Sequence, residues 1–262
     1  FCAPPRCPWW CCRARAEHNL QAMRIAVLSD IHGNLAALQA VVADFTRRGV
    51  DAVVNLGDSL SGPLLPRETA QYLMAQDWVH LAGNHERQVL DLGPHASFSD
   101  RYARSQLGPL ELAWMSGLHH TQLYHAHVLL CHGAPEQDNL ALLESADRPA
   151  TPQEIESRLG SQHAELILCG HSHVARSARS AGGGLIVNPG SVGLQAYGTD
   201  HPHPHVIASG SPDARYAIVE RSPSGWTAEM LTVPYAHPQM AALARLRQCL
   251  DWEHALLTGT MP

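Results

Sequence analysis

Residues of the types that bind divalent metal ions stand directly after several short apolar runs of this chain. Apolar runs that end in turns predict buried strands, and open α/β folds hold their ligands at the carboxyl ends of such strands. Two Asp, one Asn and several His, with no Cys among them, suit two hard-to-borderline divalent cations. In chain order the residues are Asp30, His32, Asp58, Asn84, His85, His132, His171 and His173. The pattern predicts a two-metal hydrolase site.

The motifs around these residues resemble those of calcineurin-like metallophosphoesterases, of the compact bacterial phosphodiesterase type. Each motif alone is a weak signal, but together they follow the family's order across residues 23–220. The resemblance implies an α/β fold in which two facing mixed β-sheets are flanked by helices, as a four-layer sandwich. The matching stretches are Ser29–Asn34, Gly57-Asp58, Gly83–Glu86, Cys131–Gly133, Gly170–His173 and Asn188–Ser191. The last of these predicts a rigid turn beside the His171–His173 loop.

The resemblance also implies how the ligands divide between two metals. Asp58 bridges, because a carboxylate has two oxygens, and the spacing of His32 from Asp30 suggests an extended turn that sends both side chains to one centre. Two cations about 3.5–4 Å apart can clamp a bridging water that attacks phosphorus in line. Mn²⁺ or Fe²⁺ is favoured, with Zn²⁺, Ni²⁺ or Co²⁺ as alternatives. The first metal takes Asp30, His32 and His173, and the second takes Asn84, His132 and His171.

His85 is predicted to be catalytic rather than a ligand. Beside Asn84, it can protonate the leaving oxygen or stabilise the developing charge; the alternative is support of the metals. Protein Ser/Thr phosphatases of the superfamily continue from Gly-Asp to Asp-Arg-Gly, whereas Ser61 and Gly62 stand in place of that Asp and Arg. This departure argues against protein-phosphatase activity and leaves the partner of His85 open. Arg87 either approaches the phosphate or is a solvated helix charge.

Phosphodiester hydrolysis is the predicted function. The alternatives are a phosphomonoesterase or dinucleoside-polyphosphate hydrolase on the same site, and a non-catalytic scaffold such as the retromer subunit that resembles this fold. A net charge of −6 with His neutral disfavours capture of long nucleic acid. No apolar run is long enough for a membrane span. The expected partner is a small phosphate ester.

Residues 23–262 are predicted to form a single domain, with a helical cap at about 87–120 and an insertion at about 198–212. Four of the seven Cys fall in the first twelve residues, and we interpret residues 1–22 as a disordered or non-native extension. Cys131, Cys169 and Cys249 are interpreted as reduced core thiols, which favours a cytoplasmic protein.

Local patterns predict the order of the elements. A β-α-β-α-β unit with parallel strands opens the domain, and strands at 216–219 and 226–233 are assigned to the second sheet. One helix is expected over 237–257. The insertion, which carries Pro at alternate positions, is expected to be extended and without secondary structure, either as a flap over the metals or as a surface loop.

Overall fold

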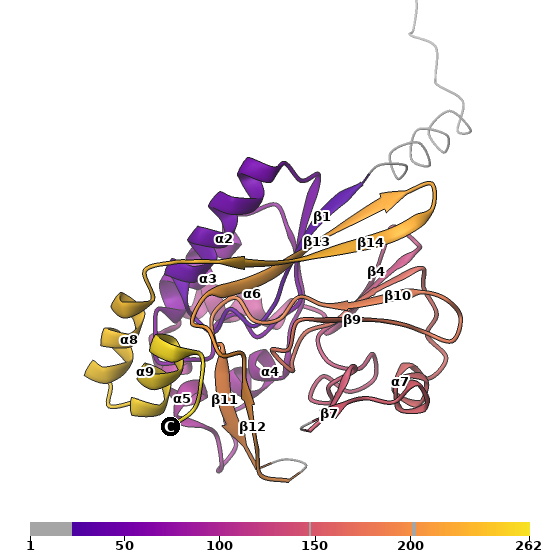
Figure 1. Ribbon diagram of the computed structural model, residues 1–262. Helices are drawn as coiled ribbons and strands as arrows, with labels where there is room; N and C mark the ends of the chain where they lie inside the picture. The colour runs from indigo at the N-terminus through magenta and orange to yellow at the C-terminus, as the bar shows by residue number, and fades with distance from the viewer. Residues whose placement is uncertain (1–22, 147, 201–202) are drawn as a thin grey trace, which may run out of the picture.

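Two five-stranded β-sheets lie face to face in the computed structural model, which describes residues 23–146, 148–200 and 203–262 (Figure 1). The first sheet has the order β14-β13-β1-β2-β3, and its strands are β1 (Arg24–Leu28), β2 (Ala52–Asn55), β3 (Val79–His80), β13 (Ala214–Ser222) and β14 (Gly225–Val233). The second has the order β4-β5-β8-β10-β9, with β4 (Thr121–Tyr124), β5 (Val128–Cys131), β8 (Leu166–Leu168), β9 (Arg176–Arg179) and β10 (Leu185–Asn188). Strands β1, β2 and β3 run parallel, as do β5, β8 and β10. Each sheet therefore collects several carboxyl ends at one edge.

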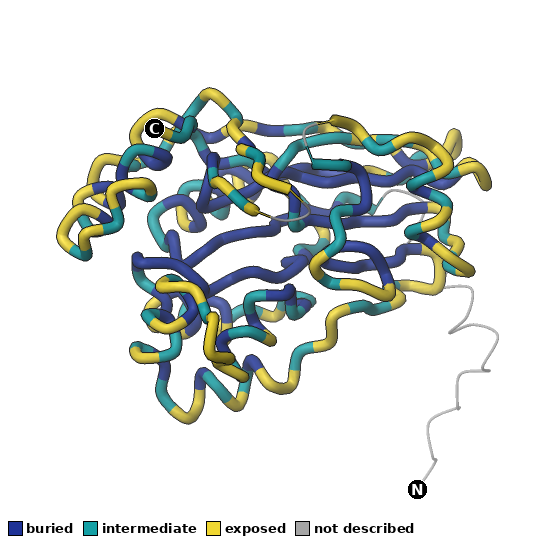
Figure 2. The backbone as a smooth tube through the Cα atoms, turned by 90° about the horizontal axis from the view of Figure 1, so that it is seen from below, coloured by how far each residue is buried: buried dark blue, intermediate teal, exposed yellow. Residues whose placement is uncertain are grey.

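Helices cover the outer face of each sheet. The first sheet is covered by α2 (Leu35–Arg48), α3 (Pro66–Met74) and α6 (Pro109–Ser116), and the second by α7 (Pro152–Leu159). A separate apolar cluster fills the space between the sheets, where Val27 and Val54 of the first meet Leu130 and Leu168 of the second. In Figure 2 these central strands are the dark blue, buried part of the tube. The predicted four-layer α/β sandwich is confirmed.

Helix α2 shows how local sequence places an element against its sheet. The side chain of Asn34 accepts a hydrogen bond from the backbone N–H of Ala37 at 3.1 Å, which caps the first turn. Leu38 and Val41 then bury one face of the helix against β1 and β13, and Gly49, with a positive φ of 71°, ends the helix. Helix α2 is the first helix of the predicted β-α-β-α-β unit, which is confirmed.

Strands β13 and β14 belong to the first sheet, so their assignment to the second sheet was wrong. Strand β13 pairs antiparallel with β1, with Ala26 opposite Ile218, and β14 pairs with β13. Strand β2 pairs with only one edge of β1, so the other edge is left for β13. Both faces of β13 are apolar, since Tyr216 faces the helices and Ala217 faces the second sheet. A pattern of this kind fits a central strand of either sheet.

The C-terminal region forms two helices rather than the single one predicted. Helix α8 (His237–Leu246) ends at Arg247, whose Nη1 donates to the carbonyl oxygens of Pro63 and Leu64. Gln248 has a left-handed backbone with a φ of 59°, which lets the chain turn back into α9 (Leu250–Thr258). The pair packs on Leu64. It thereby forms a wall beside the edge where the strands end (Figure 1).

The insertion at about 198–212 has secondary structure of its own, which corrects the expectation of an extended loop. Strands β11 (Ala196–Thr199) and β12 (His205–Ala208) pair antiparallel, with Tyr197 opposite Ile207. Pro204, which has no backbone N–H to donate, lies directly before β12 and outside the paired residues. A second small ribbon is formed by β6 (Glu144–Ser145) and β7 (Arg148–Pro149).

The predicted cap, which lies between β3 and β4 in the chain, consists of three short helices. Helices α4 (Asn84–Leu90) and α5 (Phe98–Gln106) precede α6, and each of the three packs on a neighbouring helix. Among the described residues, no helix is long and apolar enough to cross a membrane. The interpretation of residues 1–22 as an extension lies outside the described residues.

The carboxylate of Asp44 is predicted to stabilise the fold, because it joins α2 to β13. It is 8% exposed and accepts hydrogen bonds from Tyr216 Oη at 2.8 Å, Arg48 Nε at 2.7 Å and Arg47 Nη2 at 2.7 Å. Asp44→Ala leaves the buried hydroxyl of Tyr216 without its acceptor, which should lower the free energy of unfolding by about 1–3 kcal/mol near pH 7. Urea unfolding measures this loss, with exposed Asp77→Ala as the control.

The same contribution should depend on pH with a defined sign. Burial alone would raise the pKa of Asp44, but hydrogen bonds from Tyr216, Arg48 and Arg47 hold it below its usual value. The stabilisation is therefore complete above the unfolded carboxyl pKa of about 3.9 and is lost as the pH falls through the lower folded pKa. The difference between wild type and Asp44→Ala should shrink in acid. A difference that grows in acid would contradict this assignment.

Candidate metal centre

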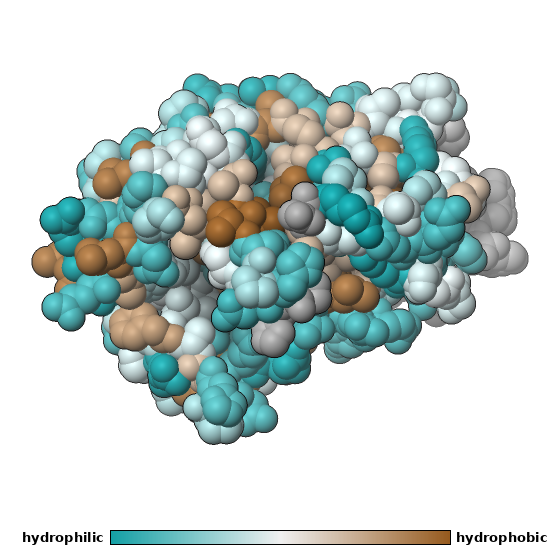
Figure 3. All heavy atoms as spheres, turned by 60° about the horizontal axis from the view of Figure 1, so that its bottom comes forward, coloured by the Kyte–Doolittle hydropathy of each residue, from teal (hydrophilic) through white to brown (hydrophobic). Residues whose placement is uncertain are grey.

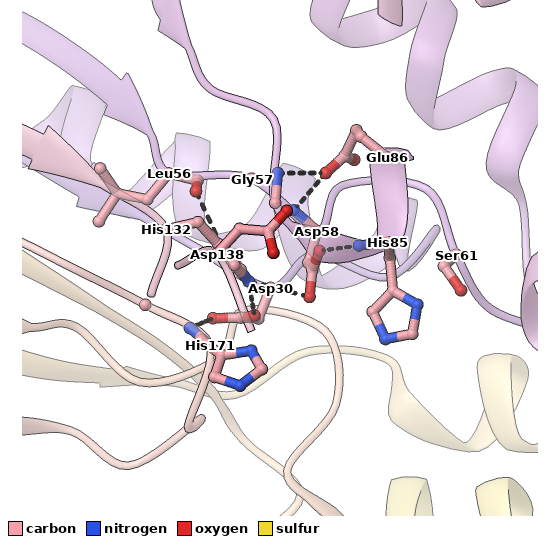
Figure 4. A network of polar contacts seen from close by, with 12 residues as sticks. Asp30, Leu56, Gly57, Asp58, Ser61, His85, Glu86, His132, Asp138 and His171 are labelled. Carbon is pink, nitrogen blue, oxygen red and sulfur yellow. Dashed lines mark hydrogen bonds and ion pairs between the residues drawn. The ribbon is translucent and has the colours of Figure 1, made fainter. Parts of the chain in front are cut away.

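Six of the predicted ligands converge in two adjacent groups at the carboxyl ends of the strands. Figure 4 labels four of them, Asp30, Asp58, His132 and His171. Within each group the ligand atoms lie within 4.8 Å of one another. The groups adjoin, since His132 Nε2 of one lies 3.9 Å from Asp30 Oδ1 of the other. The first group is Asp30, His32 and His173, and the second is Asp58, His132 and His171. Asp58 is thus grouped with the second set, and its bridging of both metals stays a prediction.

The histidines of the first group direct bare ring nitrogens at one another. Nδ1 of His32 lies 2.7 Å from the carbonyl oxygen of Ser61, and Nδ1 of His173 lies 2.7 Å from that of Leu194. A carbonyl oxygen only accepts, so Nδ1 carries the proton of each neutral ring and Nε2 keeps a lone pair. Yet the two Nε2 atoms are 3.2 Å apart, and that of His173 is 3.3 Å from Asp30 Oδ1. Lone pairs that converge in this way favour a shared cation.

The second group repeats this arrangement. Nδ1 of His132 lies 2.9 Å from the carbonyl oxygen of Leu56, while its Nε2 faces Asp58 Oδ2 at 3.1 Å. Nε2 of His132 and the buried Oδ1 of Asn84 have no hydrogen-bond partner within the described parts of the chain. Buried polar atoms are rarely left unpaired. These unpaired acceptors fit a divalent cation, which binds imidazole nitrogen and amide or carboxylate oxygen.

The backbone beneath these side chains adopts the left-handed conformation, which non-glycine residues rarely take. Each such residue costs roughly 1–3 kcal/mol, and such residues cluster at functional sites. The predicted extended turn is therefore wrong: tight left-handed turns bring Asp30 and His32 to the same group. The φ angles are 57° at Asp30, 53° at His32, 53° at Asp58, 69° at His171 and 58° at His173.

Glu86, to which the sequence assigned no role, joins two of the ligand-bearing loops. Its buried carboxylate accepts hydrogen bonds from the backbone N–H groups of Asp58 at 2.8 Å, Ser59 at 2.8 Å and Gly83 at 2.7 Å. The loops are so close that a Cβ on Gly83 would lie 2.3 Å from Asp58 Oδ1. Gly83 followed three residues later by Glu is a helix-capping pattern, but that pattern does not reveal the contact with the other loop.

The turn at Asn188–Ser191 holds two further loops. The amide nitrogen of Asn188 donates to the carbonyl oxygen of Gly170 at 2.7 Å and to Ser172 Oγ at 3.0 Å, so the predicted support of the His171–His173 loop is confirmed. Ser191 Oγ also donates to the carbonyl oxygen of Asp30 at 2.8 Å. One turn therefore fixes the loops that carry the first ligand group.

Most of the charge states in the two groups suit metal binding. Burial lowers the pKa of His32 and of His171 to about 4, so both rings are neutral near pH 7. Burial opposes ionisation of the carboxyls, but neighbouring histidines hold the pKa of Asp30 at about 2 and that of Asp58 well below its usual value. Burial also opposes protonation of His132, yet Asp58 and Asp30 raise its pKa to about 10. In the metal-free site His132 therefore carries a proton between the two carboxylates, and it must release this proton to bind a cation.

A cleft of about 1200 Å³ opens above the two groups. The cap lines one side, and β11 and the C-terminal helices line the other. Tyr197 lies against His173 with ring centroids 4.7 Å apart, and Trp252 lies against His32 with centroids 6.0 Å apart. Figure 3 shows hydrophobic surface, in brown, near the middle of the face that carries the β11–β12 hairpin. The cleft therefore has the two ligand groups at its floor and an aromatic wall.

Comparison with known proteins places this geometry in a family. The family model of the Calcineurin-like phosphoesterase superfamily domain matches residues 23–208. The chain belongs to this superfamily. A metallophosphoesterase from Sphaerobacter thermophilus has a TM-score of 0.69 at 22% identity over 90% of this chain and 100% of that one. A hypothetical protein from Pyrococcus horikoshii OT3 has a TM-score of 0.70 at 17% identity over 92% of this chain and 100% of that one.

A curated relative extends the comparison over a short stretch. An uncharacterized protein of Methanocaldococcus jannaschii is 39% identical over 66 residues. The aligned stretch covers 25% of this chain and 27% of the relative. The family match ends before β13, so the C-terminal helices that form the cleft wall lie beyond it. The match spans every residue of the two ligand groups.

His85 stands outside both groups, where the prediction placed it. Its backbone N–H donates to Asp58 Oδ1 at 2.9 Å, and its side chain is 28% exposed toward the cleft. Nδ1 of the ring lies 2.8 Å from Oδ1 of Asp100 in the cap helix α5. Burial alone would lower the pKa of His85, but Asp58 and Asp100 raise it to about 9. Asp100 is a polar partner that the sequence did not reveal.

The structure explains the departure from the protein-phosphatase pattern at Gly62. A Cβ there would lie 2.5 Å from the carbonyl oxygen of His32 and 2.9 Å from Trp252 Cη2, so an arginine does not fit. Arg87 is an exposed helix charge. Its guanidinium pairs with both carboxylate oxygens of Asp138, at 2.9 and 2.7 Å, and its side chain is 57% exposed.

The other predicted surface and core residues divide as follows. Four histidines in or near the β4–β5 hairpin are exposed: His119, His120, His125 and His127. Cys131 and Cys169 are buried free thiols, as expected. Cys249 is partly exposed at the start of α9 and lines the cleft, so its interpretation as a core thiol was wrong.

Proposed function

We propose that this phosphoesterase chain hydrolyses phosphodiesters with two divalent cations. The observation that carries the proposal is the convergence of lone-pair atoms on two adjacent points. Nε2 of His132 and Nε2 of His173 each face a carboxylate oxygen there, and Nε2 of His32 faces that of His173. The Nδ1 atom of each of these rings is committed to a backbone carbonyl. A cation is the partner that these lone pairs can share, and two adjacent cations suit a phosphate ester.

The chain's residues would hold these cations in two sets. Asp30, His32 and His173 would bind one, and a second set, with Asn84 added, would bind the other, while Asp58 is proposed to reach both. When bound, the cations would supply positive charge for the phosphoryl oxygens and lower the pKa of water. Oxygen and imidazole ligands without thiolate favour Mn²⁺ or Fe²⁺, with Zn²⁺, Ni²⁺ and Co²⁺ as alternatives.

His85 is proposed to protonate the leaving oxygen. Because its Nδ1 is committed to Asp100, Nε2 is the atom left to serve the substrate. Direct attack by water is supported by the state of the thiols near the site. Cys131 and Cys169 are fully buried, and burial raises the pKa of both, so neither is a ready nucleophile.

The size and lining of the cleft support a diester over a monoester. A single phosphate occupies a small part of about 1200 Å³, whereas a diester has two organic groups that need room. The aromatic wall at Tyr197 and Trp252 offers contact area to the group that does not leave. The position of Gly62, where no arginine fits, is also unlike the phosphate grip of a protein phosphatase.

A substrate panel tests the proposal. The protein, stripped of metal by a chelator and reloaded with Mn²⁺ or, under nitrogen, Fe²⁺, is assayed on bis-p-nitrophenyl phosphate, p-nitrophenyl phosphate and a dinucleoside polyphosphate. We expect metal-dependent turnover with the highest kcat/KM on the diester. Preference for either other substrate would select the corresponding alternative activity. Two bound metals without turnover on any substrate would favour a scaffold.

Trp252 is predicted to contribute to diester binding. Trp252→Leu removes one aromatic contact from the cleft wall, and such contacts contribute about 0.5–1.5 kcal/mol beyond buried area, so KM should rise about 2–10-fold. The change should leave both metals bound and spare kcat, because Trp252 is absent from both ligand groups. Trp114→Leu, on α6 and away from the cleft, is the control. An unchanged KM on every diester would remove Trp252 from the substrate site.

A further inference from the structure

The carboxylate of Asp100 is held in one orientation by three side chains. Its Oδ1 lies 2.8 Å from His85 Nδ1 and accepts from Ser61 Oγ at 2.7 Å, and its Oδ2 accepts from Ser97 Oγ at 2.5 Å. The residue is 2% exposed. A buried carboxylate with this many partners has little freedom to rotate, so it fixes whatever group it contacts.

The backbone of Asp100 is fixed as well. Asp100 is the third residue of α5, and its N–H donates to the side chain of Ser97, which caps the helix, at 3.0 Å. Helix α5 packs on α4, the helix that begins with Asn84 and His85. The acid and the histidine therefore come from neighbouring helices of the cap, and their distance depends on how these helices pack.

Ser61 connects this arrangement to the departure noted in the sequence. It stands where protein phosphatases of the superfamily carry Asp, and its hydroxyl reaches the same oxygen of Asp100 that faces His85. The carboxylate that contacts His85 is thus carried by α5 and not by the loop after β2. Figure 4 shows Ser61, on that loop, beyond His85. Ser61 occupies the position of the loop aspartate, and its hydroxyl donates a hydrogen bond to Asp100.

We propose that Asp100 is the positioning residue of His85, delivered by the cap helix α5 in place of a loop aspartate. The inference rests on the proposed function of His85 as an acid, and adds the residue that aims it. Because Nδ1 is held by Asp100, the ring turns Nε2 toward the cleft and keeps the tautomer or charge that places a proton there. The site is therefore complete only when the cap is folded onto the sheets.

Kinetics of Asp100→Asn separate this role from a purely structural one. We expect kcat to fall by about 10–100-fold, the usual effect of losing a partner that orients a functional histidine. KM and the content of two metals should stay unchanged, and diesters with poor leaving groups should lose most. Glu111→Gln is the matched control, because Glu111 is the third residue of α6, caps its own helix and contacts Gln71 rather than His85. Its kcat should equal that of the wild type.

Two measurements keep the inference independent of activity. The NMR signal of the Nδ1-bound proton of His85, recorded with diamagnetic Zn²⁺ as the added metal, should be present in the wild type and lost in Asp100→Ser. The double variant Ser61→Asp/Asp100→Ser, which moves the carboxylate to the other side of the same pair, should restore both this signal and most of the lost kcat. Melting temperatures identify variants that fail to fold.

The outcomes divide clearly. Wild-type kcat in Asp100→Ser with poor leaving groups, or an unchanged Nδ1–H signal in that variant, would overturn the inference. A double variant that regains the signal without regaining kcat would overturn it too, since the ring would be held and turnover still lost. If the wild type hydrolyses no phosphate ester, the proposed function fails, and loss of the signal in Asp100→Ser would then show only that the contact exists.

Discussion

Asp58→Asn is expected to lose most of the metal from at least one site and to reduce turnover by more than about 100-fold. Loss of a residue that only supports a ligand already costs about 10–100-fold, and Asp58 is a proposed ligand itself. Its Oδ2 faces His132 Nε2 at 3.1 Å, so the carboxylate charge is removed where the lone pairs converge. Without that charge, two cations would face each other with less compensation. Elemental analysis of the dialysed protein measures the metal content.

The fold should survive this substitution. Oδ1 of Asp58 accepts a hydrogen bond from the backbone N–H of His85 at 2.9 Å, and the amide oxygen of Asn can accept the same bond. Circular dichroism and the melting temperature of metal-free protein should therefore match those of metal-free wild type. Asp77→Asn, which neutralises an exposed carboxylate, is the control. Two bound ions with normal turnover in Asp58→Asn would falsify the assignment of Asp58.

The ligands could be found from the sequence because strand ends are marked locally. Asp30 and Asp58 follow buried parallel strands that are neighbours in one sheet, and parallel neighbours bring their carboxyl ends together. His132 and His171 follow β5 and β8, which are parallel neighbours in the other sheet. The apolar runs predict the strands, and strand order then predicts the meeting of the side chains.

The backbone conformation beneath these ligands could not be found in the same way. Asp and His occur in many turn types, and nothing in Asp30-Ile31-His32 indicates two left-handed residues. The conformation is imposed by contacts with other loops, such as the hydrogen bond from Gly193 N to the carbonyl oxygen of Asp30 at 3.0 Å. The cost of this strain is met by tertiary packing, which a local pattern does not contain.

Asp100 and Trp252 were missed for a related reason. Ser97 followed three residues later by Asp is a common helix start, so the pattern accounts for Asp100 without reference to His85. Trp252 reaches the cleft only because Arg247 and Gln248 break the C-terminal helix and turn α9 back. In both cases the position depends on how distant elements pack.

Strand β13 shows the limit for topology. Its two apolar faces predict a buried strand, and that part of the interpretation was right. Which sheet it joins is decided by the edge of β1 that β2 leaves unpaired, and β1 lies near the other end of the described chain. Chain order placed it after β10 and so favoured the wrong sheet.

His85→Asn is expected to keep both metals and to lower kcat by about 10²–10⁴-fold, the usual contribution of a positioned acid or base. The metals should stay because His85 lies outside both ligand groups and touches Asp58 only through its backbone N–H. If His85 protonates the leaving oxygen, diesters with poor leaving groups should lose most, which a series of substituted phenyl esters measures. Exposed His127→Asn is the control. An equal loss across the series would assign His85 to charge stabilisation or support instead, and an unchanged kcat would remove it from catalysis.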